Sequence, residues 1–71
     1  MSAPRWDYDL TEREAEVLQE LVKGGTKAKI ADTLCISQHT VVSHLRHIYD
    51  KLHVSNRTEA VVKAVRERLV D

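Results

Sequence analysis

The stretch TKAKIADTLCISQHTVVSHLRHIYDKL, residues 26–52, decides the fold expected of this chain. Its first part, residues 27–34, places three apolar side chains on one side of a helix with 3.6 residues per turn: Ile30, Ala31 and Leu34. Residues 35–37 interrupt that pattern. The hydroxyl of Ser37 can then cap a second helix, because it can accept from a backbone N–H of the following turn. The stretch therefore predicts two helices joined by a short turn.

The second helix, residues 38–52, is expected to be amphipathic. Its apolar residues recur at steps of four, three and four and so form one line: Val41, Leu45, Ile48 and Leu52. At about 100° per residue, other side chains fall roughly 90° to 190° away from this line and should face outward: His39, Val42, Ser43, Arg46 and Asp50. A buried stripe opposite a polar, partly basic side is typical of a helix that docks into DNA.

Length and composition limit the fold class. A chain of 71 residues supports one domain with one small core. Two glycines, one proline, no phenylalanine and a nearly continuous helical period predict an all-α fold. The single cysteine, Cys35, excludes an intramolecular disulfide and fits a reducing cytoplasm. No apolar run approaches about 18 residues and no signal-peptide pattern is present, so we expect a soluble cytoplasmic protein without membrane contact.

The charges are unevenly distributed, although the formal net charge is zero. Residues 1–25 carry three basic and six acidic side chains, whereas residues 26–57 carry five basic and two acidic ones. The positive excess thus coincides with the predicted helix pair, which favours a polyanionic partner. Five basic residues in such a stretch would also be compatible with an ordinary solvated surface.

The rest of the chain supplies the boundaries. Residues 1–9 show no helical period and are interpreted as a linker or leading segment, with Trp6 and Tyr8 expected to lie against the folded part, residues 10–71.

Two further helices are expected, one on each side of the pair. Thr11 followed by Glu14 is a capping box that opens a helix to about residue 23, and Asn56 with Glu59 repeats that spacing and opens a helix to about residue 69.

This order of helices and motifs resembles the LuxR-type (NarL/FixJ, GerE-like) DNA-binding domain. The resemblance extends from residue 10 to about residue 64 and rests on residues in order and in register: Leu10-Thr11-Glu12-Arg13-Glu14, Glu16-Val17-Leu18, Gly24, Ile30-Ala31, Leu34, Ile36-Ser37, Thr40-Val41, His44-Leu45, Ile48, Lys51-Leu52, Val54 and Arg57-Thr58-Glu59-Ala60. It implies a four-helix bundle whose second and third helices form a helix-turn-helix, whose third helix reads the major groove, and whose fourth mediates dimer contact. It also implies a bacterial transcriptional regulator, either the output domain of a two-component response regulator or a stand-alone GerE-like protein.

Contacts to the DNA backbone are expected at both helices. The first turn of the second helix, around Thr26, Lys27 and Lys29, offers free backbone N–H groups and a positive dipole end to a phosphate. In the third helix, Thr40 and Lys51 are better placed for phosphates than for bases. Such contacts position the protein on the duplex without specifying sequence.

Contacts to the bases are expected from five residues of the third helix: Gln38, His39, Val42, Ser43 and Arg46. Arg46 is the best candidate, because a guanidinium can bridge O6 and N7 of guanine. The role of Arg57 stays open between a phosphate contact and an ion pair with Glu14.

Two positions depart from the pattern of the resembling family. Relatives commonly carry a lysine at the position of Val42, and we expect this valine to meet a thymine methyl group instead. Relatives often carry an acid at the position of Lys29. A lysine near a helix N-terminus is slightly unfavourable, so we expect a DNA phosphate to compensate it. Lys29→Ala should then reduce the salt dependence of binding by about one unit.

Parts of the sequence also fit functions other than DNA binding. The apolar residues of the fourth helix cover roughly 200° of arc, which suits a dimer or a pure protein-interaction module; the expected interface residues are Val61, Val62, Val65 and Leu69. RNA polymerase is a further candidate partner. The helix-turn-helix of a sigma factor would share the groove-docking physics but lack the motifs at Leu10 and Arg57.

Catalytic and metal chemistry find no support. The polar residues lie on the outside of a helix in a chain too short to build a cleft around them, so no enzyme activity is expected. His44 and His47 have a ligand-compatible spacing without a convincing third and fourth ligand, so neither a metal nor another cofactor is expected. Protonation of His39, His47 and His53 near pH 6 is a hypothesis for stronger attraction to phosphate.

Overall fold

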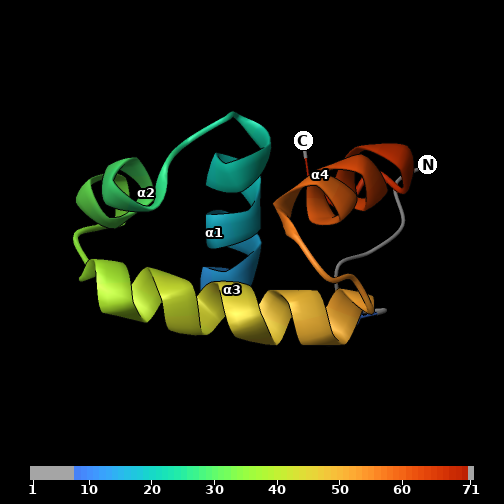
Figure 1. Cartoon of the computed structure of the whole chain (residues 1–71), viewed down its shortest axis with the longest axis horizontal. Helices are drawn as coiled ribbons and strands as arrows, with labels where there is room; N and C mark the ends of the chain where they lie inside the picture. Colours follow the sequence, from blue (N-terminus) through green and yellow to red (C-terminus); the bar gives the residue numbers. More distant parts are fainter. Residues whose placement is uncertain (1–7, 71) are drawn as a thin grey trace.

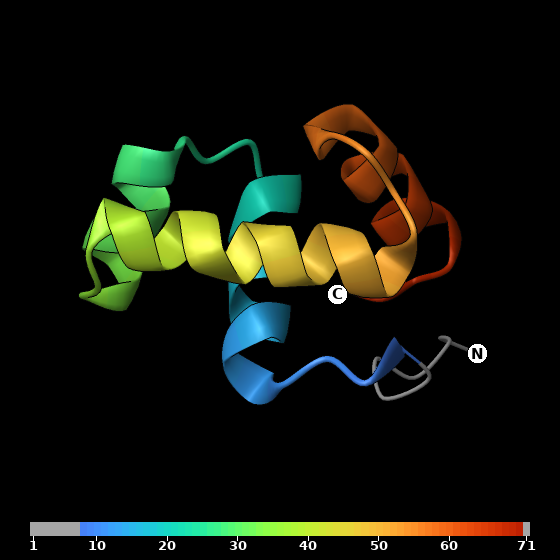
Figure 2. The same cartoon turned by 60° about the horizontal axis from the view of Figure 1, so that its bottom comes forward.

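The fold consists of four helices around one core. The computed structural model describes residues 8–70, and within that range there is no strand. The helices are α1 (Glu12–Val22), α2 (Lys27–Leu34), α3 (Gln38–Leu52) and α4 (Arg57–Arg66). Figure 1 shows α3 along one edge of the molecule, with α2 and α4 above its two ends and α1 between them. In Figure 2, where this edge comes forward, α1 crosses behind α3. The expected all-α, four-helix architecture is confirmed.

Each helix begins at a polar cap that satisfies a free backbone donor. Thr11, Thr26, Ser37 and Asn56 each accept from the backbone N–H three residues later. The capping box of α1 is complete, since the N–H of Thr11 donates to Glu14 Oε1 over 3.0 Å. At α4 the reciprocal bond differs from a capping box. The Glu59 carboxylate accepts from the N–H of Ser55, the residue before the cap, over 2.7 Å. The predicted helix starts are therefore confirmed.

The turn between α2 and α3 depends on one left-handed residue. Cys35 has φ 57° and ψ 43°, and the next N–H, that of Ile36, donates back to Ala31 O over 3.0 Å. This is the bond that closes a helix end before the chain reverses direction. Residues 35–37 thus form the three-residue turn that the sequence predicts.

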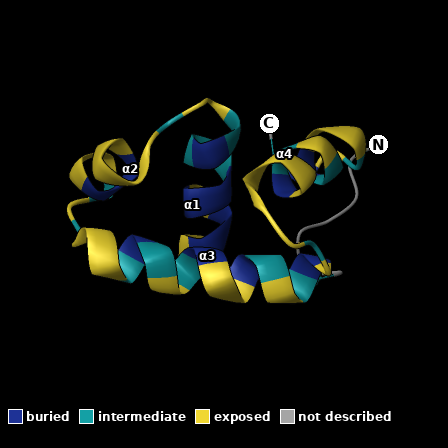
Figure 3. Ribbon diagram, in the orientation of Figure 1, coloured by how far each residue is buried: buried dark blue, intermediate teal, exposed yellow. Residues whose placement is uncertain are grey.

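The core lies between α1 and the inner side of α3. The apolar line predicted for α3 is buried throughout, and it packs with residues of the other helices: Val17, Leu18, Leu21, Ile30, Ala60 and Ala64. Figure 3 shows the exposed residues of α3 on its side remote from α1. Burying the line fixes the rotation of α3 about its axis and therefore decides which side chains face outward.

The C-terminal end corrects one predicted boundary. Helix α4 ends at Arg66 rather than near residue 69. After a left-handed residue at Arg68 (φ 55°), the N–H of Leu69 donates to Ala64 O over 2.8 Å. Leu69 is thereby turned into the core, where it is 7% exposed. The prediction that Leu69 lies in a dimer interface is wrong, because this side chain packs within the domain.

The N-terminal segment joins the fold before the expected boundary at residue 10. Tyr8 packs against the core, its hydroxyl donates to a carboxylate oxygen of Glu67, and the Nζ of Lys63 lies 5.2 Å from the centroid of its ring. Tyr8 therefore lies against the folded part as predicted, whereas Trp6 lies outside the described residues.

Candidate nucleic-acid interface

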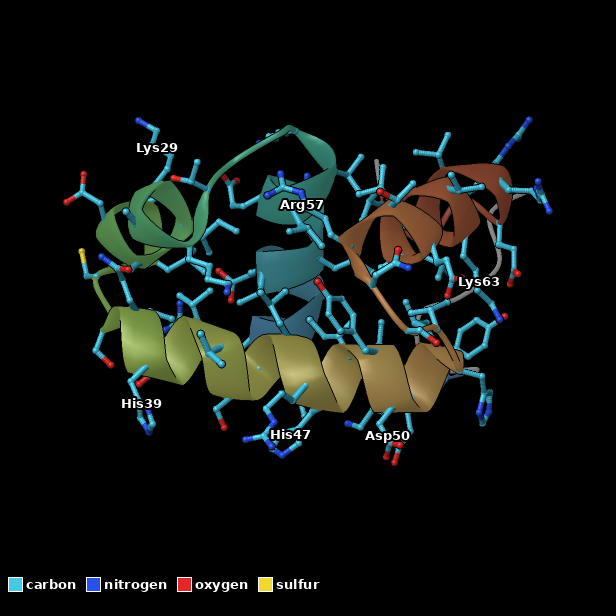
Figure 4. All side chains as sticks on the ribbon, viewed as in Figure 1. Lys29, His39, His47, Asp50, Arg57 and Lys63 are labelled. Carbon is cyan, nitrogen blue, oxygen red and sulfur yellow. The ribbon has the colours of Figure 1, made fainter. Side chains whose placement is uncertain are left out.

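The outward side of α3 carries most of the predicted base-contacting residues. Gln38, His39, Ser43 and Arg46 are exposed, and Val42 is half-buried at the margin. Figure 4 shows His39 and Asp50 pointing away from the other three helices, with His47 on the same side of the molecule. No other helix lies beyond α3 on this side in Figure 1.

The first turn of α3 is held by side-chain hydrogen bonds. Ser37 Oγ accepts from the N–H of Thr40 over 3.1 Å, and the two hydroxyls lie 2.8 Å apart. Thr40 is half-buried, while Gln38 and His39 between them are exposed. The cap thus presents the N-terminal residues of α3 in a fixed arrangement, which is where a helix in the major groove contacts base edges.

Lys51 has a structural role that replaces the expected phosphate contact. Its Nζ lies 2.6 Å from Glu14 Oε1 and 2.8 Å from Asp9 O, and its side chain is only 27% exposed. Its three donor positions are therefore largely used within the domain. We correct the prediction: Lys51 ties α3 to α1 and to the segment before α1, because its position on α3 faces the buried carboxylate.

Glu14 is the acceptor of this contact and, among residues 8–70, the one charged residue in the core. Burial raises the pKa of its carboxyl group, but the hydrogen bond from Lys51, the backbone bond from Thr11 and the charges of Lys51 and His47 outweigh burial. The pKa consequently lies below its ordinary value of 4.5. Glu14 is therefore a carboxylate at neutral pH.

Arg57 joins α4 to α1, although through a different acceptor from the one expected. Its Nη2 donates to Leu21 O over 3.3 Å at the C-terminal end of α1. The expected ion pair with Glu14 does not form, because Arg57 contacts the C-terminal end of α1 whereas Glu14 lies in the first turn of that helix. Figure 4 places Arg57 on the side of the molecule opposite to His39 and His47, which does not favour a phosphate contact shared with α3.

The predicted residues of α2 are not all directed toward the outward side of α3. Thr26 and Lys27 are exposed at the start of the helix, where Thr26 Oγ1 accepts from the N–H of Lys29 over 3.1 Å. The side chain of Lys29 points in the direction opposite to His39 in Figure 4. Its placement does not support the expected contact with a duplex that lies against α3.

The exposed surface of α4 is apolar in part. Val62 is 46% exposed and Val65 is 57% exposed, whereas Val61 is half-buried. Two shallow hollows of about 330 and 270 Å³ lie beside this helix, and Thr58 and Val62 line both of them. Val62 therefore forms a ridge between two depressions.

Metal-binding clusters and membrane-spanning helices are both absent from the described part of the chain. Among residues 8–70, no group of three or more His, Cys, Asp or Glu side chains could hold a metal ion. No helix in that part of the chain is both long and apolar enough to cross a membrane. His44 is half-buried on α3, as expected for a packed residue.

Two contacts that hold α3 against its neighbouring helices could not be predicted from the sequence. The pairing of Glu14 with Lys51 and the bond from Lys63 Nζ to Leu52 O, 2.8 Å, join residues far apart in the chain. Their spacing follows no local rule, unlike the caps. Only the packing of α1 and α4 on α3 brings them together.

The capped pair α2 and α3, with its short turn and the polar outward side of α3, defines a helix-turn-helix domain. Comparison with known proteins agrees, because the family model of the bacterial regulatory proteins, luxR family, matches residues 8–64. This chain belongs to that family.

Similar proteins are transcriptional regulators of greater length. The chain is 48% identical over 58 residues to the transcriptional regulatory protein LnrK of Bacillus subtilis (strain 168), covering 82% of this chain and 26% of LnrK. It is 42% identical over 62 residues to the uncharacterized transcriptional regulatory protein YhcZ of the same organism, covering 87% and 29%. The crystal structure of the response regulator ChrA, from a heme-sensing two-component system, superposes with a TM-score of 0.82 at 48% identity, covering 86% of this chain and 30% of ChrA. The chain therefore spans less than a third of these relatives.

Proposed function

We propose that this domain binds double-stranded DNA sequence-specifically by inserting α3 into the major groove, as the DNA-binding part of a bacterial transcriptional regulator. The observation that carries the proposal is the division of α3, whose buried line fixes the helix while its polar residues face solvent together. A groove about 12 Å wide accepts one such helix.

The base contacts are assigned to the exposed residues near the start and middle of α3. Arg46 is exposed and has no intramolecular hydrogen bond or ion pair among the contacts described, so its guanidinium can bridge guanine O6 and N7. Gln38, His39 and Ser43 supply further polar contacts. Val42, half-buried at the margin, offers its methyl groups to a thymine methyl.

Backbone contacts are assigned to Thr26, Lys27 and Thr40. The start of α2 combines an exposed lysine with free N–H groups of a helix terminus, which suits one phosphate oxygen. Lys29 and Lys51 are left out, the first for its direction and the second for its bonds to Glu14 and Asp9.

Self-association through α4 completes the proposal. The exposed ridge at Val62 and its neighbour Val65, with the half-buried Val61, can pack against the same surface of a second copy about a two-fold axis. Two copies would then contact half-sites about one helical turn apart. The same exposed valines support a second candidate function, a protein-interaction module that does not bind DNA.

The similar proteins suggest the setting in which the domain works. ChrA is the response regulator of a two-component system, and LnrK is a transcriptional regulatory protein. We place this domain in the same setting, as the output domain of a response regulator or as a stand-alone regulator in the cytoplasm, with RNA polymerase as a further partner and without enzyme activity.

Selection of bound duplexes from a random DNA pool tests the proposal. The wild-type domain should enrich one sequence family, and Arg46→Ala should lose the preference at a guanine position while retaining weaker binding. Arg66→Ala on α4, also an exposed arginine, is the matched control and should enrich the same sequences as the wild type. Failure to bind any duplex at low salt would contradict the proposal and favour the interaction module.

A further inference from the structure

His47 lies on the outward side of α3 and also approaches α1. Its side chain is 64% exposed, and its Nδ1 is 3.8 Å from Glu14 Oε2. Figure 4 shows the ring on the same side of the molecule as His39. One nitrogen of the imidazole therefore faces a buried carboxylate, while the opposite edge of the ring is available to a ligand on the outward side of α3.

The carboxylate beside His47 is fixed in position. Glu14 Oε1 accepts from the backbone N–H of Thr11 and from Lys51 Nζ. The other oxygen, Oε2, is the one that faces His47. The pKa of Glu14 is lowered in spite of its burial, so the group stays negative at the pH values at which a histidine titrates. A fixed anion at Nδ1 attracts the proton of that nitrogen and orients the ring with Nε2 outward.

We propose that His47 is a further DNA-contacting residue, whose imidazolium donates its Nε2–H to a phosphate oxygen of duplex DNA while Glu14 acts from α1 as the positioning residue. The proposal rests on the proposed function. It also selects one histidine from the three whose protonation could strengthen binding.

Other charged groups surround His47. Glu14 approaches it from α1, and on α3 its neighbours one turn away include His44, Asp50 and Lys51. The charge of Lys51 is paired with Glu14, and Asp50 lies one turn along α3 from His47. A duplex phosphate adds a further negative charge, so DNA binding should be linked to uptake of a proton by His47.

The test measures affinity for a duplex of arbitrary sequence at low salt, because a phosphate contact does not depend on base sequence. A duplex of about 30 base pairs holds two half-sites one turn apart. Wild-type protein should bind roughly threefold more tightly at about pH 6 than at about pH 8, since a histidine changes charge in that interval. His47→Gln should lose most of this gain.

A matched variant separates His47 from a general charge effect. His53→Gln removes an exposed histidine at the C-cap of α3 and should retain the gain at low pH. At about pH 6, His47→Gln should also reduce the slope of log affinity against log salt by about one unit relative to wild type, with no difference at about pH 8.

The positioning by Glu14 is tested in the wild-type protein, because replacing Glu14 would also remove the Lys51 contact. At about pH 8, nitrogen chemical shifts of the His47 ring should show a neutral imidazole with its proton on Nδ1; a proton on Nε2 would overturn the role of Glu14. Full retention of the low-pH gain by His47→Gln, or its equal loss in His53→Gln, would overturn the phosphate contact. Absence of duplex binding at every pH would overturn the proposed function, and this contact with it.

Discussion

The two halves of α3 use the same kinds of side chain for different purposes. In the N-terminal half the exposed polar residues, with Arg46 at the end of that half, make no bonds that tie them to another helix among the contacts described. In the C-terminal half, Lys51 is bonded to Glu14 and Asp9, and Leu52 O accepts from Lys63 of α4. The C-terminal half is thus bonded to α1 and α4, whereas the exposed polar residues of the N-terminal half have no such bonds among the contacts described.

This difference shows why basic residues cannot be assigned to DNA from their type alone. Arg46 and Lys51 lie on one helix and both belong to the positive part of the sequence. Only the neighbouring helices distinguish them, because α1 presents a buried carboxylate to Lys51 and no acceptor to the outward side at Arg46. A basic residue that neutralises a core acid is no longer available to a phosphate.

The largest expected effect is on the stability of the fold, through Lys51 in the C-terminal half of α3. Lys51→Ala should lower the free energy of unfolding by about 2 kcal/mol, because it leaves Glu14 buried without its charged donor. Chemical denaturation monitored by circular dichroism measures this value. Arg46→Ala is the control, and its free energy of unfolding should stay within about 0.5 kcal/mol of wild type. Equal stability of the two variants would remove the distinction between the halves.

The next largest effect is on DNA affinity, through Arg46 in the N-terminal half of α3. Arg46→Ala should weaken binding to the selected duplex by about 1–2 kcal/mol and relax the preference at one guanine. Fluorescence anisotropy with the selected duplex and a duplex altered at that guanine measures both quantities. If Arg46→Ala weakens binding to both duplexes equally, Arg46 contacts phosphate rather than a base.

A smaller effect is the pH dependence of the stabilisation that ionised Glu14 provides. Because the pKa of Glu14 is lower in the folded protein than its ordinary value of 4.5, its ionisation stabilises the fold above that value. This contribution should be lost as the pH falls through the lowered pKa. The difference in the free energy of unfolding between wild type and Glu14→Gln should therefore shrink between neutral and acidic pH; a difference that stays constant would mean that the charge of Glu14 does not stabilise the fold.

The smallest effect concerns the extent of the interface on α2. Since the side chain of Lys29 points away from the outward side of α3, Lys29→Ala should leave the salt dependence of DNA binding unchanged. Lys27→Ala, at the first position of the same helix, should reduce it by about one unit. Titrations at several salt concentrations compare the two variants, and a reduced slope for Lys29→Ala would restore the contact expected from sequence.

The helices and their rotation could be predicted from sequence because their signals are local. Ser37 and Thr11 mark helix starts by hydrogen bonds within one turn, and the spacing of Val41, Leu45 and Ile48 fixes the buried side of α3. The outward residues follow from that spacing.

The corrected assignments depend on contacts between distant residues. Lys51, Arg57 and Leu69 each have their role decided by a partner on another helix or by the reversal of the chain after α4. No periodicity within one segment carries that information. The Schellman-type turn at Arg68, which buries Leu69, likewise has no glycine to indicate it.

Chemical-shift mapping with the selected duplex tests most directly whether the outward residues in the N-terminal half of α3 contact DNA. The resonances of Val42, Ser43 and Arg46 should shift on addition of the duplex, whereas those of Arg57 and of Lys29 on the other side of the molecule should change little. Unperturbed resonances at Val42, Ser43 and Arg46, with shifts confined to α4, would contradict insertion of α3 into the groove.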